Sequence, residues 1–240
     1  MLNIAHKNKS LTVYEFLNKS LNNEYIDGIN IDVVMTRDER VVYFTSVNTT
    51  ITEISQIQEN NYSTIKQEQF LTLKELLEYI KDSEKSILIN ILSVYNLNEY
   101  NLKEINRKNK QFIVNILKDI ESYSNKKFYL YSENNAIVKL LQSIKIKRKN
   151  IVMGLSVSEQ NLNFQDVDFY VIRPNMISQE IIDVLFIREK EVMVNLIDNN
   201  DFIITLDSIT PHKLELLKSK YKSLYLINRY PEILNKVLGI

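Results

Sequence analysis

The sequence predicts an α/β protein, and more narrowly a closed (β/α)8 TIM barrel. Short runs rich in β-branched residues alternate along the chain with amphipathic runs of helical period. This alternation is typical of parallel strands joined by helical crossovers. Roughly eight such units in one chain fit a closed barrel better than an open doubly wound sheet. The chain has 240 residues and no evident linker, so we expect a single domain over residues 1–240.

Each predicted strand is a short apolar run bounded by polar or turn-forming residues. The third run follows the second so closely that the two form either one bent strand or a short hairpin. The predicted strands are 3–6, 29–34, 41–45, 86–92, 127–131, 150–155, 168–173, 191–197 and 223–227.

The segments between most strands carry apolar residues at helical spacing. Pro211 and Pro231 open two of them, at the first-turn position where a helix tolerates proline. The predicted helices are 11–23, 72–80, 102–122, 136–144, 178–186, 211–221 and 231–238.

Composition excludes several classes of function. There is no cysteine, which excludes disulfides, thiol nucleophiles and thiolate metal sites. Lys+Arg and Asp+Glu number 30 each, so charge gives no reason to expect nucleic acid as a partner. No apolar stretch is long enough for a signal peptide or a membrane helix, so we expect a cytoplasmic protein without a membrane span. The oligomeric state, and membership of a longer membrane-linked protein, are left open.

Several short motifs carry a resemblance to a known family. They are Ile4-Ala5-His6-Lys7, Ile29-Asn30-Ile31-Asp32-Val33, Thr36-Arg37-Asp38, Val41-Val42-Tyr43-Phe44-Thr45-Ser46 and Ile89-Asn90-Ile91-Leu92. In order and spacing they resemble the glycerophosphodiester phosphodiesterase family, whose strings usually read I-A-H-R-G, I-E-L-D-V, T-K-D-G, V-V-x-H-D and I-E-I-K. Weaker resemblances at residues 69–77, 131–132, 192–198 and 226–231 extend it over nearly the whole chain. The resemblance implies a TIM barrel of that family's type.

The same resemblance implies a family site at the strand ends that is largely lost in this sequence. His6 matches the family's acid/base histidine, and Lys7 replaces its phosphate-binding arginine. Asn30, Asp32 and Asn90 stand where three acidic metal ligands would be, so one negative charge remains of three. Thr45 and Ser46 replace a second catalytic His-Asp pair, and neither hydroxyl titrates near neutrality. Leu92 replaces a lysine. The small cap that follows Thr45 looks shortened.

Three interpretations of function follow. The first is a catalytically inactive or strongly impaired homologue that binds a phosphate-containing or polyol ligand, or a partner. The alternative is an active glycerophosphodiester phosphodiesterase with a variant site built on His6, Asn30 and Asp32. The third is a purely structural or partner-binding barrel. We expect no tightly bound cofactor, and a weak Mg²⁺ or Ca²⁺ site at Asn30, Asp32 and Asn90 is left open.

The candidate ligand contacts are Lys7, Asn30, Asp32, Asn90, Arg173 and Arg229. The three cationic residues among them follow the ends of predicted strands. Most of the family's acidic metal ligands are absent here, although Asp198 lies nearby. We therefore expect a locally positive mouth that favours a small anion. The alternative is that Arg173 and Arg229 pair with surface carboxylates. His212, the other histidine, is expected at the surface.

Overall fold

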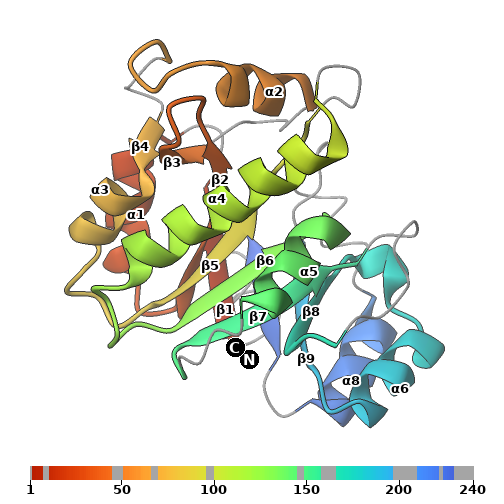
Figure 1. The fold of residues 1–240 in the computed structure, drawn as a ribbon. Coiled ribbons are helices and arrows are strands. Elements are labelled where there is room, and N and C mark those ends of the chain that lie inside the picture. Colours follow the sequence, from red (N-terminus) through yellow and green to blue (C-terminus); the bar gives the residue numbers. More distant parts are fainter. Residues whose placement is uncertain are drawn as a thin grey trace.

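The computed structural model describes residues 2–7, 11–44, 51–65, 70–95, 100–144, 149–157, 166–196, 210–221 and 224–229. Eight parallel strands close into a barrel, because the first strand pairs with both the second and the last strand of the ring. The predicted TIM barrel is therefore confirmed (Figure 1). In ring order the strands are β1 (Leu2–His6), β2 (Gly28–Met35), β5 (Ser86–Ile91), β6 (Phe128–Ser132), β7 (Ile151–Ser156), β8 (Phe169–Ile172), β9 (Glu191–Asn195) and β10 (Tyr225–Asn228).

The second strand bends out of the ring at its carboxyl end. Residues 28–30 of β2 pair in parallel with β1, whereas residues 32–35 pair antiparallel with β3 (Val41–Phe44). A third strand, β4 (Phe70–Thr72), then pairs antiparallel with β3. The predicted segments 29–34 and 41–45 thus form a hairpin, and β4 was not predicted.

The helices surround the barrel, and the six predicted ones within the described residues are present. One further helix, α2, and the short 3-10 helix η2 were not predicted, and the predicted helix 231–238 lies outside the described residues. The helices are α1 (Val13–Leu21), α2 (Ile51–Glu59), α3 (Leu73–Tyr79), α4 (Leu102–Ile120), α5 (Asn135–Ser143), α6 (Gln179–Ile187) and α8 (Pro211–Lys220), with η2 at Pro174–Met176. No helix in the described ranges is both long and apolar enough to cross a membrane.

Local sequence explains where several helices begin. Thr12 and Thr72 each accept a hydrogen bond from the backbone N–H three residues on, and the carboxylates of Glu15 and Glu75 accept one from the backbone N–H of the cap. These reciprocal capping boxes satisfy donors that a helix start leaves unpaired. At α8, Pro211 occupies the first turn behind a Thr210 cap, as the sequence predicted.

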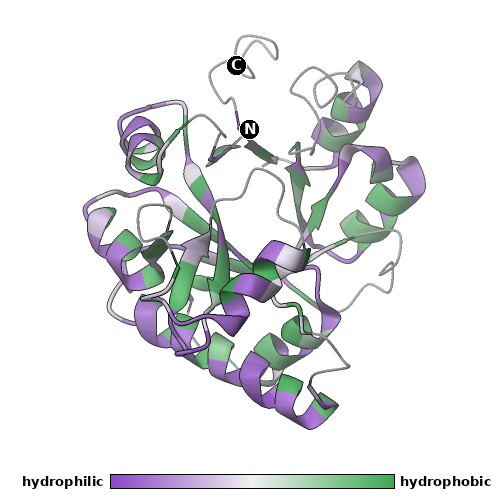
Figure 2. Cartoon of the chain, turned by 90° about the horizontal axis from the view of Figure 1, so that it is seen from above, coloured by the Kyte–Doolittle hydropathy of each residue, from purple (hydrophilic) through white to green (hydrophobic). Residues whose placement is uncertain are grey.

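The barrel interior is filled by large side chains at its middle level. Ile4, Leu88, Tyr129, Phe169 and Met193 are all almost completely buried and belong to one cluster. Gly154 on β7 makes room for this packing, because a Cβ there would lie 2.4 Å from the ring of Phe169. Viewed from above, the chain shows mostly hydrophobic strands surrounded by helices of mixed hydropathy (Figure 2). The barrel is therefore a solid core that presents a floor to whatever binds above it.

Candidate functional site

A cavity of about 450 Å³ lies above this floor, at the carboxyl ends of the strands. In TIM barrels this end carries the functional site. Polar side chains from seven barrel strands or the residues directly after them line the cavity: His6, Asn30, Asp32, Asn90, Tyr131, Arg173, Asn195 and Arg229. The structure thus brings together the residues that the sequence placed at the mouth, with the exception of Lys7, which is not among the lining residues.

A row of hydrogen bonds ties three of these side chains together. The amide Nδ2 of Asn30 lies 2.9 Å from His6 Nδ1 and donates to it, so the imidazole carries its proton on Nε2. The amide oxygen of Asn30 accepts a bond of 2.8 Å from the hydroxyl of Tyr131. Asn30 is 2% exposed, so both polar ends of its amide are engaged inside the protein. The sequence analysis placed Tyr131 at the end of a predicted strand and missed its role as a hydrogen-bond donor to Asn30.

The remaining carboxylate of the matched metal positions is held by an amide. Nδ2 of Asn90 donates to Asp32 Oδ1 over 2.9 Å, which joins two strands whose residues are 58 apart in sequence. The other oxygen of Asp32 lies 3.9 Å from His6 Nε2. The contact is long for a hydrogen bond but close enough for the carboxylate to orient and polarise the imidazole.

His6 is held in its neutral form by its surroundings. Burial lowers the pKa of His6 below its usual range, and the carboxylate of Asp32 opposes this effect without outweighing it. The positive charges of Arg229 and Lys7 act in the same direction as burial. A neutral imidazole can accept a proton at neutral pH, or donate its Nε2–H to a ligand as a hydrogen bond.

The outer rim holds a carboxylate that the sequence did not reveal. Glu133 follows β6 and pairs with Arg173, with 3.3 Å between Oε1 and Nη2, while Ser156 donates to the same oxygen over 3.4 Å. Among the described lining residues, the two arginines Arg173 and Arg229 therefore face the two carboxylates Asp32 and Glu133. Glu133 offsets part of the positive charge that the sequence led us to expect at the mouth, and it was missed because the family strings contain no counterpart to it.

Other candidate residues lie away from the cavity or outside the described ranges. His212 is exposed in the first turn of α8, as expected. Burial lowers the pKa of Lys7, and nearby Arg229 lowers it further. Thr45, Ser46 and Asp198 lie outside the described residues.

The unpredicted helix α2 contributes an apolar wall. Ile51 and Ile54 of α2 line the cavity together with Leu92 and Val94, which follow β5. Ile54 is 4% exposed and packs in a small cluster with Val34 and other apolar residues, whereas Ile51 is 68% exposed at the rim. The cavity therefore has a polar side formed by the strand ends and an apolar side formed by α2 and the segment after β5.

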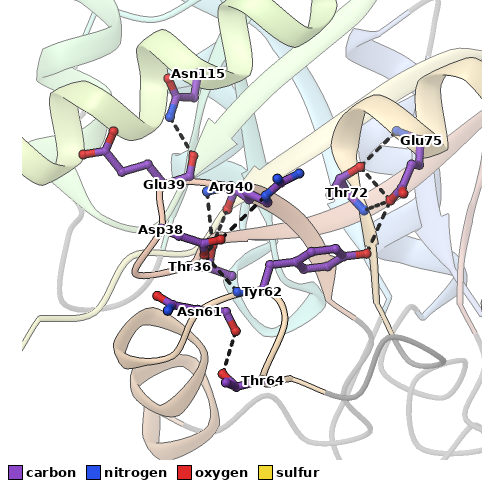
Figure 3. A network of polar contacts seen from close by, with 10 residues as sticks. All are labelled: Thr36, Asp38, Glu39, Arg40, Asn61, Tyr62, Thr64, Thr72, Glu75 and Asn115. Atoms are coloured by element: carbon purple, nitrogen blue, oxygen red, sulfur yellow. Dashed lines mark hydrogen bonds and ion pairs between the residues drawn. The ribbon is translucent and has the colours of Figure 1, made fainter.

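A polar network anchors the segment after α2 to the turn between β2 and β3 (Figure 3). Asp38 Oδ1 accepts hydrogen bonds from the hydroxyl of Thr36 (2.7 Å) and from the backbone N–H of Tyr62 (2.8 Å). The backbone N–H of Arg37 donates to the carbonyl of Asn60, the residue directly after α2. Thr36, Arg37 and Asp38 are the residues that resemble the family's T-K-D string, and here they fix the position of α2 over the mouth.

The resemblance implies a site for a hard divalent cation at Asn30, Asp32 and Asn90. The side chains present at these positions do not fit such a site. Such an ion requires several oxygen ligands, most of them anionic. Asn90 points an N–H, rather than its oxygen, at Asp32, and the oxygen of Asn30 already accepts from Tyr131. No group of three or more His, Cys, Asp or Glu side chains in the described ranges is arranged to hold a metal. Instead, Asn30 is bonded to His6 and Tyr131, and Asn90 is bonded to Asp32 with its own oxygen buried and without a hydrogen-bond partner.

No protein-family model and no curated protein matches the chain. Solved structures do match. A phosphodiesterase from Oleispira antarctica, in complex with the product sn-glycerol-3-phosphate, has a TM-score of 0.71 at 15% identity and covers 100% of this chain and 97% of its own. A putative glycerophosphodiester phosphodiesterase from Galdieria sulphuraria has a TM-score of 0.71 at 14% identity. The match covers 100% of this chain and 98% of that one. A glycerophosphodiester phosphodiesterase from Thermotoga maritima has a TM-score of 0.65 at 16% identity. The match covers 99% of this chain and 98% of that one.

These likenesses confirm the fold over the full length of the chain. The protein has the TIM-barrel fold of the glycerophosphodiester phosphodiesterase structures, as the short motifs implied. Fold alone does not carry function, which depends on the groups in the site.

Proposed function

We propose that this barrel binds a small phosphate-containing or polyol ligand at its mouth and is catalytically inactive or strongly impaired as a phosphodiesterase. The observation that carries the proposal is the hydrogen bond from Asn90 to Asp32. In it the matched ligand position of Asn90 offers the carboxylate of Asp32 an amide N–H, and the amide oxygen of Asn90, which is buried without a hydrogen-bond partner, carries no negative charge for a catalytic metal.

The binding half of the proposal rests on the donors that remain. Arg173 and Arg229 line the cavity, and the Nε2–H of the neutral His6 completes a set of donors suited to a phosphate or a hydroxyl. The pair between Arg173 and Glu133 joins two side chains that are more than half exposed, so a ligand anion can replace the carboxylate at small cost.

The inactive half rests on the missing second acid/base group. Phosphodiester cleavage needs one group to take a proton from the nucleophile and another to deliver one to the leaving group. Among the described lining residues His6 is the one imidazole, and Glu133 is occupied by Arg173 and Ser156. Loss of one such group typically lowers the rate by ~10²–10⁴-fold.

One observation favours the second candidate, an active phosphodiesterase with a variant site. The neutral His6 lies 3.9 Å from Asp32, an arrangement in which a carboxylate can stabilise an imidazolium formed during proton transfer. Turnover above roughly 1 s⁻¹, the low end of the usual range for enzymes, with loss on His6→Ala, would establish this candidate and overturn the inactive one.

Binding is tested by calorimetric titration with sn-glycerol 3-phosphate in the presence of a chelator. We expect measurable binding, and a loss of roughly 10-fold or more in affinity for Arg229→Gln, since a hydrogen bond to a charged group contributes about 1.5–3 kcal/mol. Arg107→Gln is the matched control, because Arg107 is exposed on α4. Absence of binding at millimolar ligand, or an equal loss in both variants, would contradict the proposed ligand site.

A further inference from the structure

The two sides of the cavity differ in a way that a glycerol phosphate alone does not require. The polar side is made by the strand ends, and the apolar side by Ile51, Ile54, Leu92 and Val94. A small, fully hydrated headgroup gains nothing from an apolar wall, because burying polar groups there without partners costs free energy.

The apolar side is part of a supported surface. Leu92 and Val94 pack against the cluster that holds Ile54, and the backbone N–H of Val94 donates to Gln58 Oε1 of α2 over 3.2 Å. The wall therefore continues from next to Asn90 out to Ile51, whose side chain is 68% exposed at the rim. A contiguous apolar surface leading out of a polar cavity indicates a bound group that is itself apolar.

From this arrangement we propose that the ligand is a single-chain amphiphile: a phosphate-bearing polyol head at the strand ends, with an acyl or alkyl chain along the wall of Ile51, Ile54, Leu92 and Val94. The inference rests on the proposed function, which supplies the head. A volume of about 450 Å³ lies within the range of pockets that bury ligands larger than a bare phosphate ester.

The test compares sn-glycerol 3-phosphate with its 1-hexanoyl ester by calorimetric titration below the micellar concentration of the ester. Each buried methylene should tighten binding by about fourfold, from ~0.8 kcal/mol per methylene. A chain that buries only two or three methylenes should therefore improve the dissociation constant at least about 10-fold.

Two matched variants locate the chain. Ile51→Asp introduces a charge on the wall at an exposed position, so the ratio of the two dissociation constants should fall towards one. Ile187→Asp does the same on α6, where Ile187 is 78% exposed, and should leave the ratio unchanged.

The outcomes separate the two proposals. If sn-glycerol 3-phosphate binds and the hexanoyl ester binds no tighter, or if both variants lower the ratio equally, the amphiphile inference is overturned and the proposed function stands. If neither ligand binds, the proposed function itself is overturned. Tighter binding of the ester that is lost in Ile51→Asp alone supports the inference.

Discussion

His6 is a buried base whose charge state depends on three neighbours, two from β2 and one that follows β10. The amide of Asn30 bonds one ring nitrogen, and Asp32 and Arg229 act on the ring with opposite charges. Because the ring is 10% exposed, protonation would place a charge in a site with little water to solvate it. This couples the protonation of one side chain to the stability of the barrel mouth.

The coupling predicts a specific pH dependence of stability. The folded pKa of His6 lies below that of the unfolded chain, near 6.5. Between these two values the unfolded state binds more protons, so the free energy of unfolding falls as pH decreases below 6.5 and levels off beneath the folded pKa. The slope for one proton is at most about 1.4 kcal/mol per pH unit. His6→Gln should remove this part of the slope in urea unfolding between pH 7 and 5.

His212→Gln is the control for this measurement, since His212 is an exposed histidine on α8. It should leave the pH dependence of the wild-type protein unchanged. A wild-type slope that survives in His6→Gln, or a His6 imidazole that titrates above 6.5 by NMR, would show that burial does not dominate at this residue.

At the scale of elements, the hairpin of β2 and β3 positions α2. The turn of this hairpin includes Glu39, which stands where the family string carries glycine and has a φ of 62°. That conformation is uncommon for a residue with a Cβ. The amide of Asn115 on α4 donates to the carbonyl of Glu39 over 2.8 Å and helps to hold the turn (Figure 3).

Asp38 is the residue through which this turn holds α2. Burial acts to raise the pKa of Asp38, but hydrogen bonds from Thr36 and from the Tyr62 backbone outweigh it and leave the pKa lowered. Asp38→Ala should therefore lower the free energy of unfolding by about 0.5–1.5 kcal/mol, because it removes the carboxylate acceptor of the Tyr62 N–H at a solvent-exposed position. Urea unfolding at pH 7 measures the change.

Lys81→Ala is the matched control for Asp38→Ala. Lys81 pairs with Glu78 three residues earlier, on the protein surface. Exposed pairs of this kind contribute ~0–1 kcal/mol, so the control should be nearly neutral. If Asp38→Ala costs no more than the control, the turn does not anchor α2.

The elements also show where sequence reasoning was sufficient. Apolar spacing located the barrel strands because each is a short run bounded by polar residues, and the parallel ring followed from the helices between them. Helix α2 was missed although Ile51, Ile54 and Ile57 recur at helical spacing. The sequence analysis treated the segment after Thr45 only as a shortened cap, so no helix was predicted there.

At the scale of the whole molecule, barrel closure determines the site, and sequence reasoning captured only part of it. Residues at matched strand ends could be placed together, because parallel strands bring their carboxyl ends to one face. Which way an amide turns could not be predicted, since that depends on neighbours from other strands, as with Tyr131 beside Asn30. Glu133 was missed for the same reason: only the folded ring brings it to Arg173.

Barrel closure also brings the three matched metal positions together, so a metal-binding measurement tests the site as a whole. Asp32 on β2 and Asn90 on β5 are at paired positions of adjacent strands, and Asn30 lies two residues before Asp32 on β2. With one carboxylate among the three, we expect no micromolar Mg²⁺ or Ca²⁺ binding by calorimetry and no change in melting temperature with added cation. Asn30→Glu combined with Asn90→Glu places three carboxylates together, so this variant should be less stable than the wild type without cation.

Added Ca²⁺ should reverse that loss if ligand charge is the main deficit of the site. A dissociation constant of roughly 0.1 mM would, at about 10 mM cation, raise the free energy of unfolding by about 2.7 kcal/mol. For a chain of this size that corresponds to a rise of several degrees in melting temperature, at ~2–4 °C per kcal/mol. Asn90→Glu alone should respond less, because only two carboxylates then face the cation. If the wild-type protein is itself stabilised by cation, and Asp32→Ala abolishes the effect, the amides act as ligands and the interpretation of the three positions as metal-free is wrong.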